Sequence, residues 1–219
     1  VAQKVLDDPD AMALGGRMQE VTILMSDLRG FSGLTRVLGP REMVELLNRY
    51  LERMTDVIVA HGGMINEFIG DAILAIFGTP EPGPDDALRA ARAAIAMQLA
   101  LVDLNREQRE SGGVHLEMGI GIHTGDAVVG NIGSSKRVKW GVVGDTVNMA
   151  ARVESLTTGS QVLLSEASLE RLSDGEAETG PRRAVQVKGR TALLEVAALQ
   201  AIPGSDLRMP VVEAAAMSE

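Results

Sequence analysis

The amino-acid sequence predicts an α+β domain in which helices cover a mostly antiparallel sheet. The first observation is the order of the opening segments, strand, helix, hairpin, helix and strand, which fits a layered sandwich with antiparallel pairing. The second is the length of 219 residues, which suits one globular domain with short extensions. The third is composition: hydrophobic residues make up 45% of the chain but aromatic residues only 2%, so the core must consist mainly of Ala, Val, Ile, Leu and Met.

The first two elements are a buried strand and a long helix. A short apolar run with β-branched residues predicts the strand over 20–27. Pro40 opens the next segment, where apolar residues recur at helical spacing over 41–60, and the pair Gly62-Gly63 ends it as glycine commonly ends helices. The apolar stripe expected to face the core is Val44, Leu47, Leu51, Met54 and Ile58.

Turn residues divide the remainder of the chain into further strands and helices. The first half continues with strands over 64–68 and 72–77 joined at Gly70-Asp71, a proline-containing loop over 79–84, and a helix over 85–110. The second half is expected to contain a hairpin of 116–123 and 127–132 turned at Gly125-Asp126, a polar loop over 134–139, a strand over 140–143, a helix from 145, a strand over 161–164, a helix over 166–172, and strands near 185–187 and 194–199.

These segments suggest three parts: a polar linker or docking segment over 1–18, one domain over 19–201, and a weakly structured tail over 202–219. The net charge of −9 argues against non-specific binding to nucleic acid or to an anionic membrane. No apolar run approaches the roughly 20 residues that span a bilayer, and no signal peptide is visible. The absence of cysteine excludes disulfides and thiolate metal sites and fits a reducing, cytoplasmic location.

Two aspartates stand at the ends of apolar strands. Asp27 follows the first predicted strand, and Asp71 lies in the turn between the next two. A carboxylate in such a place is poorly solvated unless a donor or a cation meets it, and two carboxylates brought together repel each other. A shared divalent cation resolves both problems, although each residue alone also fits a plainer role as a helix cap or a turn residue.

A third segment carries an asparagine and an arginine in the helix that begins at Asp145. Asn148 and Arg152 are four residues apart, so they share one helix face. Such a pair is usually a surface feature or a local hydrogen bond. Together with the two aspartates, it predicts a site that holds metal, phosphate and a developing negative charge.

These segments resemble the class III nucleotidyl cyclases, the adenylate and guanylate cyclase family. The resemblance runs from about residue 20 to about residue 199 and includes three motifs in the family's order. It implies a ferredoxin-like sandwich, conversion of a purine nucleoside triphosphate to the 3′,5′-cyclic monophosphate, and a homodimer with shared active sites. It also implies an upstream sensor or regulatory domain in a longer protein; the chain begins at Val1 rather than Met, which fits an excised piece.

The resemblance implies a role for each motif residue. Asp27 and Asp71, with the backbone carbonyl of Leu28, would bind two Mg²⁺ or Mn²⁺ ions, one activating the ribose 3′-hydroxyl and the other holding the triphosphate. Asn148 would fix the ribose, and Arg152 would neutralise charge on the α-phosphate. The residues expected to contact phosphate are Gly30, Phe31, Ser32 and Lys188, with Arg137 or Lys136 from the basic loop.

Two positions are expected to read the base. Glu67 matches the residue that is usually Glu in guanylate cyclases and Lys in adenylate cyclases, whereas Gly141 matches neither usual pattern at the second position. A carboxylate accepts hydrogen bonds, guanine presents N1–H and N2–H₂ donors, and adenine N1 is itself an acceptor. The favoured substrate is therefore GTP. An adenylate cyclase, relaxed selectivity, and a Glu67 that pairs with a cation such as Arg137 and ignores the base remain open.

Two other functional classes compete with a purine nucleotide cyclase. One is a catalytically weak cyclase-like module that binds nucleotide and regulates a partner. The four intact motif residues Asp27, Asp71, Asn148 and Arg152 argue against such decay. The other is a two-metal nucleotidyl transferase that acts on nucleic acid, which the acidic balance and the lack of a basic stripe make a poor fit.

Overall fold

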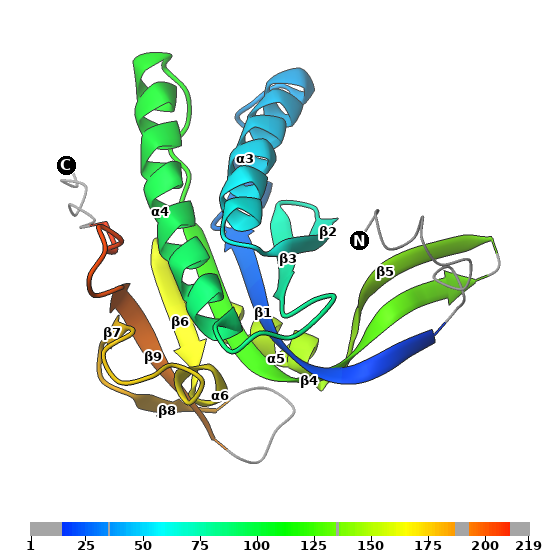
Figure 1. The fold of residues 1–219 in the computed structure, drawn as a ribbon. Coiled ribbons are helices and arrows are strands. Elements are labelled where there is room, and N and C mark those ends of the chain that lie inside the picture. The colour runs from blue at the N-terminus through cyan, green and yellow to red at the C-terminus, as the bar shows by residue number, and fades with distance from the viewer. Residues whose placement is uncertain (1–14, 35, 135, 187–192, 211–219) are drawn as a thin grey trace.

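A nine-stranded sheet with helices on both faces forms the molecule, and the predicted α+β class is confirmed (Figure 1). The computed structural model describes residues 15–34, 36–134, 136–186 and 193–210. The elements are β1 (Gly15–Leu28), α2 (Phe31–Leu34), α3 (Pro40–Ala60), β2 (Met64–Ile69), β3 (Ala72–Phe77), α4 (Asp86–Glu110), β4 (Met118–Ser134), β5 (Arg137–Val143), α5 (Asp145–Ser155), β6 (Gln161–Ser165), α6 (Glu166–Leu169), β7 (Glu178–Thr179), β8 (Arg183–Val185) and β9 (Leu194–Ala201).

The sheet has the strand order β2-β3-β1-β4-β6-β9-β7, with β5 paired to β4 and β8 paired to β9. β4 and β6 run parallel, and the other pairs in this described part of the chain are antiparallel. Figure 1 shows β1 and β4 extending together beyond the body of the sheet, with β5 alongside β4. This arrangement places the C-terminal ends of β1 and β2 and the N-terminal end of β3 next to one another.

The predicted hairpin over 116–132 is wrong, because those residues form one continuous strand. β4 pairs with β1 without interruption from Leu28↔Met118 to Gly15↔Asn131, and Gly125 lies opposite Val21 in the middle of that ladder. A Cβ on Gly125 would lie 3.1 Å from the hydroxyl oxygen of Thr146 on α5. The glycine therefore allows a helix to pack closely on the strand and does not make a turn.

Helices α3 and α4 cover one face of the sheet and enclose the larger core. The buried stripe of α3 is Met43, Leu46, Tyr50, Met54 and Ile58, whereas Val44 of the predicted stripe is 55% exposed. The prediction placed Met54 and Ile58 correctly but started the stripe one residue late, which rotated its N-terminal half away from the core. Leu47 and Leu51 are partly buried at its edge.

Helix α5 packs on the opposite face and lies very close to β4. A Cβ on Gly121 would lie 2.6 Å from the Cα of Glu154 and 2.8 Å from the carbonyl oxygen of Ala150, so any larger residue would push the helix away. The apolar partners of Ala150 include Val21 and Ile23 of β1. The orientation of α5 is thus fixed by backbone contact.

Several boundaries differ from the predictions at the ends and in the loops. β1 begins at Gly15, before the expected strand and inside the predicted linker. The polar loop over 134–139 belongs largely to the β4–β5 hairpin, in which Ser134 pairs with Arg137. Ile202, at the start of the predicted tail, is 2% exposed, and Ala201 bridges to Arg208. Within the described residues, no helix is long and apolar enough to cross a membrane.

Candidate active site

The structure brings the two predicted metal aspartates together. Asp27 is at the end of β1, and Asp71 lies in the turn between β2 and β3. Because β1 pairs with β3 through Ser26↔Ile73, the strand end and the turn are adjacent. The carboxylate of Asp71 accepts a hydrogen bond of 3.2 Å from the backbone N–H of Leu28, which fixes it beside the strand end.

The electrostatics of this pair favour a bound cation. Burial raises the pKa of the Asp71 carboxyl above its ordinary range, and the neighbouring Asp27 raises it further. Two carboxylates and a backbone carbonyl are the hard oxygen ligands that Mg²⁺ and Mn²⁺ prefer. In the described part of the chain, no cluster of three or more His, Asp or Glu side chains suited to a metal is present. Within these residues, an ion bound here would take its protein ligands from the two carboxylates and backbone oxygen atoms.

A buried, neutral side chain, Tyr50, lies near the two aspartates. Tyr50 of α3 is fully buried, and its hydroxyl donates a hydrogen bond of 3.3 Å to the sulfur of Met118. Burial raises the pKa of the Tyr50 phenol, and the negative charges of Asp71 and Asp27 raise it further. The phenol therefore adds no negative charge near the two carboxylates.

Arg29 links the end of β1, beside the predicted metal aspartates, to helix α5. Its guanidinium donates to the Glu154 carboxylate, to the Thr157 hydroxyl and, at 3.2 Å, to the backbone carbonyl of Glu154. The same guanidinium lies 4.0 Å from the Asp27 carboxylate. Burial raises the pKa of the Glu154 carboxyl, whereas Arg29 opposes that rise. Arg29 thereby gives a buried carboxylate next to these aspartates a charged hydrogen-bond partner.

The predicted catalytic pair lies on the outer face of α5. Met149, Ala150 and Val153 face the sheet, whereas Asn148 is exposed and the Arg152 side chain is 31% exposed. The guanidinium of Arg152 lies 3.2 Å from the Met149 sulfur and 3.8 Å from the Asp145 carboxylate. Among the described residues, no hydrogen bond or ion pair joins either member of the pair to the two metal aspartates. In the described chain, the predicted catalytic pair and the predicted metal aspartates are thus two separate groups of residues.

The residues predicted to read the base lie on facing strands, β2 and β5. Glu67 on β2 forms an ion pair of 2.9 Å with the ammonium of Lys139 on β5. The part of the alternative in which Glu67 pairs with a cation is thus confirmed, with Lys139 and not Arg137 as the cation. Gly141 is buried on the same strand, and a Cβ there would lie 2.8 Å from the side-chain oxygen of Asn66.

Of the residues predicted to contact phosphate, the structure describes all but Lys188. Gly30 has a φ of 68°, which suits glycine, and it leads into the four-residue helix α2 with Phe31 half-buried and Ser32 exposed. Arg137 is exposed at the start of β5. Lys188 lies outside the described residues, so its predicted contact has no structural counterpart here.

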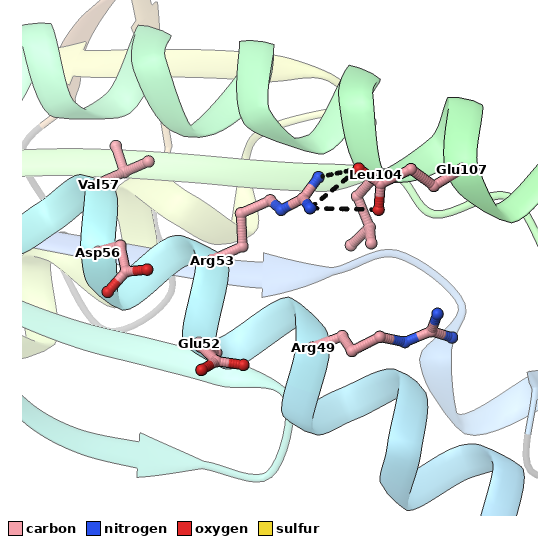
Figure 2. Close-up of a pocket in the computed structure, with 7 residues that line it drawn as sticks. All are labelled: Arg49, Glu52, Arg53, Asp56, Val57, Leu104 and Glu107. Carbon is pink, nitrogen blue, oxygen red and sulfur yellow. Dashed lines mark hydrogen bonds and ion pairs between the residues drawn. The ribbon is translucent and has the colours of Figure 1, made fainter.

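A separate pocket of about 310 Å³ lies between α3 and α4, away from all of these residues (Figure 2). Figure 2 shows Arg53 reaching from α3 to the Glu107 carboxylate on α4, where its two terminal nitrogens bind at 3.0 to 3.2 Å. Arg49, Glu52 and Asp56 complete a lining of mixed charge. The ion pair between Arg53 and Glu107 joins the two helices beside this pocket, and none of the predicted site residues line it.

Sequence reasoning missed Lys139 and the contact of Arg29 with Glu154. Lys139 is two residues before Gly141, so strand alternation alone puts both on one face of β5. The expectation of a loop over 134–139 hid this signal. The contact between Arg29 and Glu154 joins residues 125 positions apart, and no local pattern could reveal it.

Comparisons with known proteins agree with this arrangement. The family model described as "Adenylate and Guanylate cyclase catalytic domain" matches residues 15–199. A protein of Rhizobium meliloti (strain 1021) named adenylate cyclase 1 is 35% identical over 187 residues, which is 83% of this chain and 28% of that protein. The chain thus spans little more than a quarter of that relative's length.

Two solved structures are similar over nearly their whole length. The guanylyl cyclase Cya2 superposes with a TM-score of 0.86 at 45% identity, covering 90% of this chain and 100% of that one. The adenylyl cyclase CyaB from P. aeruginosa superposes with a TM-score of 0.81 at 30% identity, covering 85% and 96%.

Proposed function

We propose, from the premise that this chain belongs to the family of adenylate and guanylate cyclase catalytic domains, that it converts GTP to 3′,5′-cyclic GMP and pyrophosphate. The observation that carries the proposal is the meeting of Asp27 and Asp71 at two strand ends, with the Asp71 carboxylate fixed by the backbone N–H of Leu28.

Asp27, Asp71 and the carbonyl of Leu28 would hold two divalent cations, Mg²⁺ or Mn²⁺. When bound, these ions lower the pKa of the ribose 3′-hydroxyl and neutralise the triphosphate and the leaving pyrophosphate. The contribution of the chain itself is to hold both carboxylates close together. The backbone N–H of Leu28 and the guanidinium of Arg29 provide the local positive potential that this requires.

We further propose that the active enzyme is a homodimer in which each site uses residues of both subunits. Asn148 and Arg152 point outward from α5 and contact neither metal aspartate of their own chain within the described residues. A two-fold axis would place them over the partner's aspartates and make two equivalent sites. The exposed apolar side chains of β2 and β5 suit such an interface: Phe68, Ile69 and Val143 are 45%, 53% and 55% exposed.

In the composite site, Asn148 would orient the ribose, and Arg152 would stabilise the charge that builds on the α-phosphate during in-line displacement. The turn formed by Gly30, Phe31 and Ser32, together with Arg137 and Lys188, would hold the remaining phosphates. Because the chain spans little more than a quarter of its Rhizobium relative, we propose that a sensor or regulatory region of a longer protein controls this domain.

GTP is the favoured substrate because Glu67 offers an acceptor to the N1–H and N2–H₂ donors of guanine. The 45% identity with a structure described as a guanylyl cyclase supports this choice. The alternative is an adenylate cyclase that makes cyclic AMP from ATP. One observation supports that alternative: the ion pair with Glu67 places the ammonium of Lys139, a hydrogen-bond donor, beside the predicted base-reading carboxylate.

Product analysis with GTP and ATP offered together at equal concentration tests the proposal. Mass spectrometry of the products in Mn²⁺ should show cyclic GMP in excess over cyclic AMP, with neither formed by an Asp71→Asn variant. Mainly cyclic AMP would overturn the choice of GTP and leave the cyclase reaction standing. No cyclic product from either nucleotide would overturn the proposed function itself.

A further inference from the structure

Arg29 is the first residue after β1, and it joins two parts of the chain that carry predicted site residues. Its backbone N–H donates a hydrogen bond of 2.8 Å to the carbonyl oxygen of Glu117, the residue just before β4. Its side chain is 27% exposed, and its guanidinium reaches the C-terminal end of α5. Arg29 therefore ties the end of β1 to the helix that carries Asn148 and Arg152.

The hydrogen bonds of this guanidinium go to the end of α5 and to the turn after it. It donates to the Glu154 carboxylate, to the Thr157 hydroxyl and, at 3.2 Å, to the backbone carbonyl of Glu154. Its distance of 4.0 Å to the Asp27 carboxylate is too long for a hydrogen bond. A Cβ on Gly119 would overlap both the guanidinium and the Thr157 hydroxyl, so this glycine makes room for the contact.

These contacts supply a constraint that packing alone lacks. The close approach of α5 to Gly121 and Gly125 sets the distance between helix and strand. Such contact is non-directional, so it does not fix the position of the helix along its own axis. Hydrogen bonds from a charged donor depend on both distance and angle, and three of them at one helix end fix that position. Because Arg152 is two residues before Glu154 on the same helix, its position along the axis is fixed as well.

We propose that Arg29 is a positioning residue that fixes Asn148 and Arg152 for the reaction at the active site of the partner subunit. The inference rests on the proposed cyclase function and on its shared site, in which the α5 helix of one subunit serves the aspartates of the other. Arg29 thus lies beside Asp27 of its own chain but acts through α5 on the neighbouring site. It contacts no substrate itself.

The test places one substitution in either chain of a mixed dimer. With Asp71→Ala in one chain and Asn148→Ala in the other, the single intact site takes its aspartates from the Asn148→Ala chain and its Asn–Arg pair from the Asp71→Ala chain. Arg29→Lys is then introduced into one chain or the other. Lysine keeps a positive charge near Asp27, but its single ammonium cannot reproduce the forked guanidinium. Different affinity tags on the two chains allow mixed dimers to be purified alone.

Placement should decide the effect of Arg29→Lys. In the Asp71→Ala chain, we expect kcat for the nucleotide that the parent mixed dimer converts to fall by about 10- to 100-fold, because a misplacement of about 1 Å is enough for such a loss. KM should change by less than about twofold, since Arg152 acts mainly on the transition state. In the Asn148→Ala chain, kcat should change by less than about threefold, because the α5 of that chain serves the inactive site.

Arg53→Lys is the matched control. The Arg53 guanidinium also joins two elements, because its two terminal nitrogens bind the Glu107 carboxylate on α4 at 3.0 to 3.2 Å, but it lies away from the predicted site residues. The control should leave kcat unchanged in either chain. Glu154→Gln is a second variant, which removes the charge that Arg29 binds and keeps the shape of the side chain. It should show the same dependence on placement with a smaller loss, and it decides the matter if Arg29→Lys does not fold.

Three outcomes would overturn the role of Arg29 while leaving the cyclase proposal intact. An equal loss in both placements would mean a merely structural contact. A larger loss in the Asn148→Ala chain would mean that Arg29 acts on the aspartates of its own chain, and no loss in either placement would mean that α5 needs no such support. A parent mixed dimer that is inactive before Arg29→Lys is introduced would instead refute the shared site, and the inference with it.

Discussion

The contact between Arg29 and Glu154 gives the most informative stability prediction. The two side chains are 27% and 10% exposed, so this is a largely buried ion pair at the junction of β1 and α5. Arg29→Met leaves the Glu154 carboxylate buried without its cation, and removal of one partner of such a pair typically costs 3–5 kcal/mol. Because Arg29 is partly exposed, we expect a loss of about 3 kcal/mol in the free energy of unfolding, at the lower end of that range.

A double-mutant cycle separates this contact from other effects of the substitutions. Glu154→Gln removes the charge but keeps the shape, and we expect it to cost about 1.5 kcal/mol because the Arg29 donors keep the Thr157 hydroxyl and a backbone carbonyl. The double variant has no uncompensated carboxylate. Its loss should therefore be about 3 kcal/mol rather than the additive 4.5 kcal/mol, a coupling energy of about 1.5 kcal/mol.

Urea denaturation followed by circular dichroism, at pH 7 and one fixed protein concentration, measures these quantities. The midpoints should shift at nearly constant slope, because the variants do not change the surface exposed on unfolding. A loss below about 1 kcal/mol for Arg29→Met, or additivity within about 0.3 kcal/mol, would refute the assignment of a buried, coupled pair.

Two further predictions follow from individual contacts. Gly121→Ala should destabilise the protein by about 3 kcal/mol or prevent folding, because the added Cβ would press into the backbone of α5. Thermal unfolding measures this loss. The control is Gly112→Ala, where a Cβ meets nothing within 4 Å and only the smaller cost of backbone strain at positive φ is expected. Glu20→Gln tests a pH-dependent ion pair: Arg171 lowers the pKa of Glu20 in the folded state, so the pair adds stability above the ordinary glutamate range and loses it as the pH falls through the lowered pKa. The variant should be about 0.5 kcal/mol less stable than wild type near pH 7, and the difference should shrink as the pH falls below the ordinary glutamate range; a difference that does not shrink on acidification would contradict the ion pair.

The sequence predicted the elements whose signals are local. Pro40 and the Gly62-Gly63 pair bracket α3 correctly, because helix ends depend on residues within one turn of the boundary. The turn containing Gly70 and Asp71 was also placed correctly, since Gly70 adopts the left-handed conformation that this turn requires. Local rules are sufficient for such features.

The features that failed depend on partners far away in the chain. Gly125-Asp126 has the composition of a turn, but β1 supplies a continuous partner from Met118 to Asn131 and keeps β4 one continuous strand. The start of the α3 stripe was misplaced because Met43 and Val44 are both apolar, and only packing against the sheet decides which of them is buried.

For the site, the motif residues were predictable and their supports were not. Asp27 and Asp71 were paired from their strand ends, and the structure brings them together. The roles of Asn148 and Arg152 remain predictions, because one chain shows only their outward placement on α5. Lys139 was overlooked because its ion pair with Glu67 lies beside a bulge in another strand.

The central claim is that one active site combines the aspartates of one subunit with the Asn–Arg pair of another. The direct measurement is cyclase activity in mixtures of two inactive variants, Asp71→Ala and Asn148→Ala, at a constant total protein concentration. In a mixed dimer, one site carries both lesions and the other carries neither, so activity should rise to about one quarter of wild type when equal amounts of the two variants exchange randomly into dimers. Absence of recovery, in samples where mass spectrometry confirms mixed dimers, would contradict the shared site.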